Sequence, residues 1–350
     1  MSVTISIRNS PRLLQSFSSS PTKRITDLCK KDGVYHQQIR TLKEHQEKTV
    51  RSMYWRGRSF DRIHFESRRC DYLEWNYRSE IFAFSRRLQE NLDENTLRQI
   101  FSHPSYIDAF HQNQAKYNLP DVDIKPNTEL VQQGCTLLDN SIKPYLRYTF
   151  ERLPEEGIEA ICSYLKSVPV LSDVAKWIGC KELILTTEYP PSSEVMAETV
   201  KAVVAGVERD LGIKRARRFV VDMIISYLND KDILDDVWII PNPKETLNLI
   251  LSNSGMPTYE PRIMFQTGVK TLESCHLVAL YSDKKFLGSS PGETLPIAEE
   301  TAAIDSLQRL FDLRESRPPY VYGVKSEDID FDLHMKEHQR IRSYRYDFRS

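Results

Sequence analysis

Apolar residues recur at helical spacing along the middle of this 350-residue chain, from Tyr77 to Leu228. One face of an α-helix repeats about every 3.6 positions, so this pattern favours helices over strands. Three runs show it: Ile81, Phe82, Phe84, Leu88 and Leu92; Ile158, Ile161, Leu165 and Val168; and Phe219, Met223, Ile224 and Leu228. The first run lies in a segment rich in helix formers. We therefore predict a mainly α domain with these apolar residues on its buried faces.

Two stretches of this region, Asn127–Cys135 and Ala197–Lys201, carry an informative order of residues. The first reads Asn-Thr-Glu-Leu-Val-Gln-Gln-Gly-Cys and resembles the ribonuclease III signature Asn-Glu-Arg-Leu-Glu-Phe-Leu-Gly-Asp. The second reads Ala-Glu-Thr-Val-Lys and resembles the Asp-Thr-Val-Glu of the same family. In that family the acids of each motif share a helix face, and together they hold the Mg²⁺ that activates water against an RNA phosphodiester. At these four positions this chain has Val131, Cys135, Glu198 and Lys201.

Two further landmarks agree with the resemblance. Phe101–Tyr106 reads Phe-Ser-His-Pro-Ser-Tyr and is similar to the family's Leu-Thr-His-Arg-Ser-Tyr. Pro154-Glu-Glu-Gly157 is similar to its Pro-x-x-x-Glu-Gly. Four landmarks in the family's order imply a ribonuclease III-like domain over residues 76–230. The alternative is an unrelated helical domain with chance matches.

The residues at the four carboxylate positions argue against catalysis. Mg²⁺ requires near-octahedral oxygen ligation, whereas Val131 offers no ligand and Cys135 offers a soft sulfur. Lys201 would place an ammonium group where the metal should lie, and Glu198 alone cannot rebuild a two-metal site. We therefore expect no catalytic residue, no bound metal, no cofactor and no enzymatic activity. The alternative is an active or residually active mitochondrial endoribonuclease for double-stranded RNA.

A second pattern lies between residues 238 and 314. The expected elements are a helix to about Leu251, strands at 262–266, 276–281 and 284–287, and a helix from Pro296 to Leu313. This α+β arrangement, in the order α-β-β-β-α, resembles a double-stranded-RNA-binding domain. That family places lysines at the start of its last helix to reach phosphates, but here those positions are Leu295, Pro296 and Glu299. The lost phosphate contacts imply weak binding to free duplex RNA.

The formal net charge is only −1, so any RNA contact must come from local clusters of basic residues. One cluster lies before the helical region among Tyr54, Trp55 and Phe60, a second lies beside a predicted helix, and a third lies near the end of the chain. Guanidinium groups can pair with phosphates and stack on bases. The predicted RNA-binding residues are Arg51, Arg56, Arg58, Arg62, Arg68, Arg69, Lys214, Arg215, Arg217, Arg218, Arg340, Arg342 and Arg345. The alternative for each cluster is a solvated surface.

The start of the chain has the composition of an import signal. The first acidic residue is Asp27, and before it Arg and Lys residues lie among many serines. This predicts a mitochondrial transit peptide at 1–29, followed by a basic extension at 30–75. A charged tail is expected at 315–350. No apolar run approaches the roughly 20 residues that span a bilayer, so we expect no membrane anchor.

Two longer stretches narrow the resemblance. Tyr77-Arg-Ser-Glu-Ile-Phe-Ala-Phe84 and Asp283-Lys-Lys-Phe-Leu287 are similar to a family of large-subunit proteins of the mitochondrial ribosome. The resemblance implies a structural protein of the mitochondrial matrix that supports translation. Its implied partners are mitochondrial ribosomal RNA and other large-subunit proteins, and pairing with a second ribonuclease III-like protein stays open. A transient RNA-processing or assembly factor is the alternative.

Overall fold

The computed structural model of the chain describes residue 52 and residues 69–71, 74–117, 124–269, 271, 273–314 and 319–346. The chain divides into two compact units, Met1–Ser67 and Arg68–Ser350. All the elements described below belong to the second unit. The predicted transit peptide and most of the predicted basic extension lie outside the described residues.

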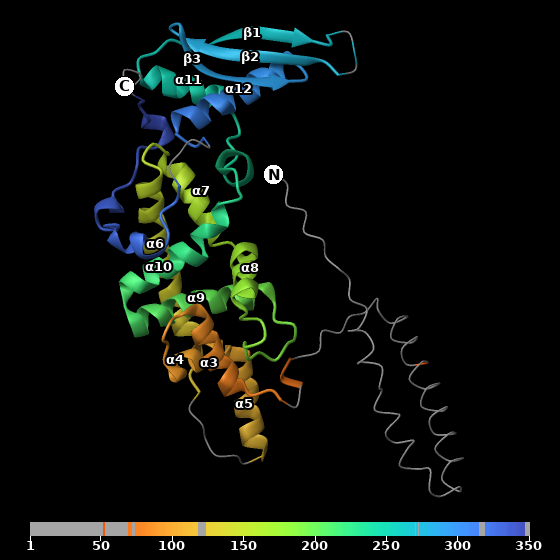
Figure 1. Cartoon of the computed structure of the whole chain (residues 1–350), viewed down its shortest axis with the longest axis vertical. Coiled ribbons are helices and arrows are strands. Elements are labelled where there is room, and N and C mark those ends of the chain that lie inside the picture. Colours follow the sequence, from red (N-terminus) through yellow and green to blue (C-terminus); the bar gives the residue numbers. More distant parts are fainter. Residues whose placement is uncertain are drawn as a thin grey trace, which may run out of the picture. The chain divides into compact units, whose positions relative to one another are not determined.

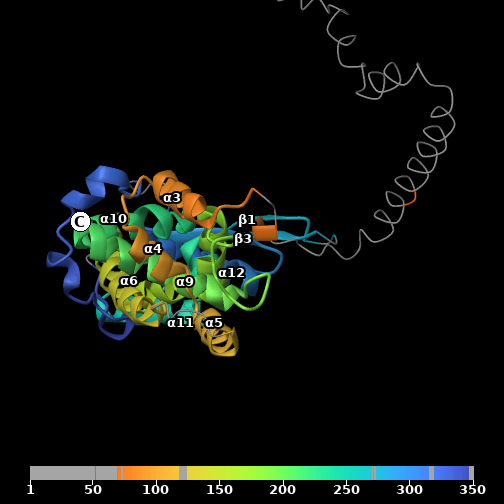
Figure 2. The same ribbon diagram turned by 90° about the horizontal axis from the view of Figure 1, so that it is seen from below.

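The first part of this unit is helical (Figure 1). Its elements are η1 (Arg69–Asp71), α3 (Tyr77–Leu88), α4 (Glu94–Phe101), α5 (Pro104–Tyr117), α6 (Thr128–Thr149), α7 (Glu155–Leu165), α8 (Val168–Ile178), α9 (Ser193–Leu211), α10 (Ile213–Met223) and η2 (Ile225–Leu228). Helix α9 packs against α4, α6, α8 and α10, and Figure 2 shows it among α4, α6 and α10. The predicted mainly α domain is confirmed. No helix in the described ranges is both long and apolar enough to cross a membrane.

Local sequence sets the limits of α9. The helix begins just after Pro190-Pro191, and the Ser192 hydroxyl caps it by accepting a hydrogen bond from the Val195 amide (3.3 Å). It ends at Gly212, whose φ of +88° is readily adopted only by glycine. These caps fix the length of the helix around which the domain is built.

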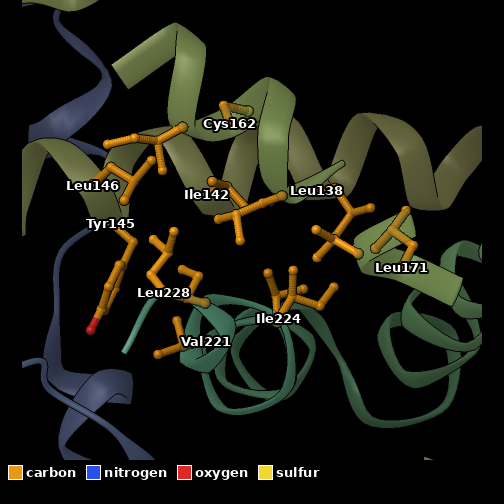
Figure 3. Close-up of a cluster of buried hydrophobic side chains, with 14 of the residues drawn as sticks. Leu138, Ile142, Tyr145, Leu146, Cys162, Leu171, Val221, Ile224 and Leu228 are labelled. Atoms are coloured by element: carbon orange, nitrogen blue, oxygen red, sulfur yellow. The ribbon is translucent and has the colours of Figure 1, made fainter. Parts of the chain in front are cut away.

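The core of the helical part lies between α6 and the segment after α10. Leu138 and Ile142 of α6 face Ile224 and Leu228 (Figure 3), and all four are buried. Complete burial of such a side chain stabilises the fold by about 1.5–3 kcal/mol. Most of the periodic apolar residues are therefore buried or half-buried, as predicted.

Two of those residues are nevertheless exposed. Phe82 is 61% exposed because α3 buries the face of Ile81, Phe84 and Ser85, and Phe82 lies about 100° around the helix from Ile81. Val168 is 39% exposed because it begins α8 instead of ending α7. The prediction that these two residues face the core is wrong.

The second part of the unit has the predicted α-β-β-β-α order. Its elements are α11 (Pro243–Asn253), β1 (Glu260–Thr267), β2 (Cys275–Ser282), β3 (Lys285–Gly292) and α12 (Leu295–Leu310), joined to the first part through η3 (Ile233–Val237). The strands form an antiparallel sheet in the order β1-β2-β3, and α11 and α12 lie on one of its faces (Figure 1). Gly292 permits the close approach of α12, because a β-carbon there would lie 2.5 Å from the Ala298 nitrogen.

Residues 319–346, which we call the strap, pack on both parts. The strap contains η4 (Gly323–Asp328), η5 (Leu333–Met335) and η6 (Ile341–Ser343), which contact α10, α6 and α11 respectively. Ile329, Phe331 and Tyr344 of the strap are buried. The described part of the predicted charged tail is therefore a packed segment and not a solvated extension.

Candidate functional site

The two signature stretches meet where α6 crosses α9. A β-carbon at Gly134 would overlap the main-chain carbonyl of Lys201, so only glycine permits this contact between helices. Cys135 adjoins the contact in α6, and Val131 and Glu198 lie one turn away from it in their own helices. All four side chains at the predicted positions are half-buried. The structure thus brings Val131, Cys135, Glu198 and Lys201 to one crossing.

Glu198, the one carboxylate among the four signature positions, has a histidine beside it. The Glu198 Oε2 atom lies 3.8 Å from His103 Nε2, and the other ring nitrogen of His103 lies 2.8 Å from the Ser105 hydroxyl. His103 lies in one of the stretches that resemble ribonuclease III, but the sequence did not indicate which residue it contacts. Within the described ranges no group of three or more His, Cys, Asp or Glu side chains is arranged to hold a metal ion. One carboxylate and one imidazole can orient a polar ligand, but they do not form a two-metal clamp.

The predicted basic patch at 214–218 faces carboxylates of the same chain. Arg215 Nε lies 2.9 Å from the Glu90 carboxylate, and Arg218 donates to Glu327 of the strap at 3.0 Å. Arg217 stacks over the Phe331 ring of the strap at 4.7 Å. Lys214 is exposed. Arg215 also lies 3.6 Å from Glu327, so all three arginines hold the strap against α10. The sequence led us to expect either a phosphate contact or a solvated surface at this patch.

The three predicted arginines near the chain end lie on the strap. Arg340, Arg342 and Arg345 are all exposed. The Arg342 carbonyl accepts a hydrogen bond from the Asn253 side chain at 3.0 Å, and the Arg345 amide donates to Gln339 at 3.0 Å. The Arg340 guanidinium group lies 3.8 Å from Glu337 and 3.9 Å from Glu159. The backbone of this segment is therefore fixed, and Arg342 and Arg345 are exposed on it.

A buried ion pair that the sequence did not reveal anchors the strap. Arg147 NH2 of α6 lies 2.5 Å from Glu155 Oε1 of α7, and the two side chains are only 6% and 2% exposed. Arg147 also donates to the Met335 carbonyl at 2.6 Å, and Glu155 accepts the His338 amide at 2.9 Å. Burial alone would raise the pKa of Glu155, but the hydrogen bonds from Arg147 and His338 outweigh it and lower that pKa. In the sequence, the only indication of this ion pair was the presence of charged residues in helices with a periodic apolar face.

The remaining predicted RNA-binding residues belong to the N-terminal cluster. Arg51, Arg56, Arg58, Arg62 and Arg68 lie outside the described residues. Arg69 is exposed, and its guanidinium group lies 5.5 Å from the Trp75 ring and 3.5 Å from Glu80. The structure therefore places this arginine at the surface, next to an aromatic ring.

The start of α12 presents an apolar and acidic surface. Leu295 and Pro296 are exposed. Glu299 accepts a hydrogen bond from the Tyr259 hydroxyl at 2.8 Å and lies 3.3 Å from Lys244. Where duplex-binding domains present lysines to phosphates, the first two turns of this helix contain no cationic residue.

Comparison with known proteins decides the family. A model of the endonuclease domain of large ribosomal subunit protein mL44 matches residues 76–207, and a model of the double-stranded-RNA-binding domain of the same protein matches residues 238–345. Large ribosomal subunit protein mL44 of Caenorhabditis elegans is 32% identical over 269 residues, which cover 75% of this chain and 67% of that protein. The chain belongs to the mL44 family. The second mL44 model includes most of the strap.

Nuclease relatives of this mL44-family chain are more distant. Ribonuclease 3 of Staphylococcus saprophyticus is 26% identical over 164 residues, covering 44% of this chain and 63% of that protein. The crystal structure of the nuclease domain of ribonuclease III from Campylobacter jejuni is 16% identical, with a TM-score of 0.37, and covers 43% of this chain and 98% of that domain.

Proposed function

We propose that this chain is a structural component of the large subunit of the mitochondrial ribosome. It binds ribosomal RNA and neighbouring large-subunit proteins in the matrix and supports translation there. The observation that carries the proposal is the 32% identity to the mL44 protein of C. elegans. The surface supports it as well, because Arg342 and Arg345 are held outwards on a fixed backbone.

We further propose that the domain has no nuclease activity. Three of its four signature positions, Val131, Cys135 and Lys201, have no carboxylate to bind Mg²⁺. When the purified chain is incubated with duplex RNA and Mg²⁺ or Mn²⁺, the amount of cleaved RNA should not exceed that in a protein-free control. Cleavage that disappears in a Glu198→Ala variant would contradict this and favour the nuclease alternative.

Sedimentation of mitochondrial lysate tests the structural role. The chain should migrate with the large subunit and stay there after a salt wash. Release by the wash, with the subunit otherwise intact, would favour a transient assembly factor.

Replacing Arg342 and Arg345 together by glutamine should release the chain from the large subunit at lower salt. Each phosphate contact contributes about 0.7–0.9 to the slope of log K against log salt, so losing two should reduce the slope by about 1.4–1.8. The measurement is the fraction of chain that stays with the subunit across a salt series. Lys176→Gln, at a lysine paired with Asp173 at 2.9 Å, is the control and should leave the slope unchanged. An unchanged slope in the double variant would show that these side chains do not contact RNA.

A further inference from the structure

An open groove on the helical part of the described structure lies away from the α6–α9 crossing. It is bounded by α3, the segment leading into α4, and the end of α9, and its volume is about 990 Å³. Its lining includes Ile81, Phe82, Arg86, Leu92, Leu97 and Arg209. We call it the α3 groove.

The floor and one rim of the α3 groove are apolar. Ile81 and Leu97 are buried beneath it, and Leu92 is half-buried. Phe82 stands at the rim with most of its ring in solvent, and the Arg86 guanidinium lies 5.1 Å from the ring centre. Exposed aromatic and arginine side chains beside an apolar floor are typical of protein interaction sites.

The acidic residues of the groove are already engaged within the chain. Asp210 accepts hydrogen bonds from the Asp93 amide at 2.8 Å and from Thr96 at 3.0 Å. Glu94 lies 3.0 Å from Arg78 and 2.7 Å from Arg98. Glu94 is therefore paired with two cations, and Asp210 is hydrogen-bonded by two neutral donors.

Two basic residues of the groove have no carboxylate partner within the described ranges. Arg86 donates to the Asn91 side chain at 3.1 Å, and Arg209 donates to Gln99 at 3.1 Å, so the partners of both are neutral amides. Neither arginine forms an ion pair with any residue of the described ranges, and both are exposed. The groove thus offers two unmatched positive charges beside an apolar floor.

We propose that the α3 groove binds an acidic, apolar segment of a neighbouring protein. An apolar side chain of that segment covers Phe82, and its carboxylates pair with Arg86 and Arg209. RNA fits this surface less well, because the apolar floor of Ile81, Leu92 and Leu97 suits an apolar side chain and not a sugar-phosphate backbone. The proposal rests on the ribosomal role above and adds a protein-binding surface to it.

Photo-crosslinking in the assembled particle tests this. The photoreactive residue p-benzoylphenylalanine replaces Ser79, an exposed residue in the groove lining, in full-length chain that migrates with the large subunit. The same replacement at Ser163, an exposed serine of α7 outside the groove, is the control. The crosslink from position 79 should map to a protein segment containing both carboxylates and apolar residues.

Charge reversal makes the test specific. Arg86→Glu with Arg209→Glu should lower the crosslink yield at position 79 by about ten-fold, because like charges then oppose each other in the interface. Phe82→Ala should also lower it, and the yield at position 163 should not change. Unchanged thermal unfolding of the variants confirms that they fold.

Crosslinking of position 79 to RNA, to nothing, or with a yield insensitive to charge reversal would overturn the proposal. Failure of the parent chain to migrate with the large subunit would instead contradict the ribosomal role itself. The two failures are therefore distinguishable.

Discussion

Replacing Arg147 by alanine should destabilise the folded chain by about 3–5 kcal/mol, because it leaves the buried Glu155 carboxylate without its cation. The change also removes the hydrogen bond to the Met335 carbonyl, which holds the strap. Chemical denaturation should give the loss in the free energy of unfolding. Hydrogen exchange should show the His338 amide, bonded to Glu155 in the parent, exchanging faster.

Two controls separate the buried pair from strap contacts in general. Arg152 also contacts the strap, with its guanidinium 5.6 Å from the Tyr346 ring centre, but it is exposed. Arg152→Ala should therefore cost only about 0.5–1 kcal/mol. The double change Arg147→Met with Glu155→Leu should recover most of the loss, because no buried charge remains. Equal losses for Arg147→Ala and Arg152→Ala would contradict the assignment.

The pH dependence of this pair has a definite sign. The pKa of Glu155 is lowered in the folded chain, so its stabilising contribution is complete above the unfolded value of about 4.3 and is lost as pH falls through the folded value. In Arg147→Ala the burial of Glu155 is no longer opposed by the guanidinium group, so its pKa is higher than in the parent, which favours the neutral form. The stability difference between parent and variant should therefore be largest near neutral pH and shrink in acid. A difference that grows in acid would contradict this.

Replacing Gly134 by alanine should cost about 3 kcal/mol, even though alanine is the better helix former by about 1 kcal/mol. The new β-carbon would lie 2.6 Å from the Lys201 carbonyl carbon, and main-chain atoms of a packed helix cannot move aside. Thermal or chemical unfolding measures the loss.

Gly206→Ala in α9 is the matched control. A β-carbon there first meets the end of the Ile100 side chain at 2.5 Å, which can rotate away. The expected loss is about 1 kcal/mol. If Gly134→Ala were as stable as the parent, α6 and α9 would not cross as closely as described.

Helices and strands could be predicted where the pattern of apolar residues along a short segment determines the secondary structure. The 3.6-residue period marked helices, and the first two strand-like runs lie within β1 and β2 because their residues favour a sheet. The third run, 284–287, covers only the start of β3, whose second half is rich in Gly, Ser and Pro. Phe82 was misplaced because apolar periodicity shows a broad stripe, whereas its actual burial depends on which neighbouring helix covers it.

The partners of charged residues could not be read from the sequence. Arg218 and Glu327 are 109 positions apart, and their pairing depends on the path of the strap. The pairing of Arg147 with Glu155 requires the turn between α6 and α7, and their burial requires the strap above them. The sequence did predict that Val131, Cys135, Glu198 and Lys201 lie close together. Both of their helices resemble ribonuclease III motifs, and in that family the corresponding residues share one site.

An experimental density map of salt-washed mitochondrial large subunits would test the central proposal most directly. We expect one copy of this chain in each particle, with the Lys201 ammonium and no divalent cation at the crossing of α6 and α9. Particles that lack the chain, or a magnesium ion bound beside Glu198, would contradict it.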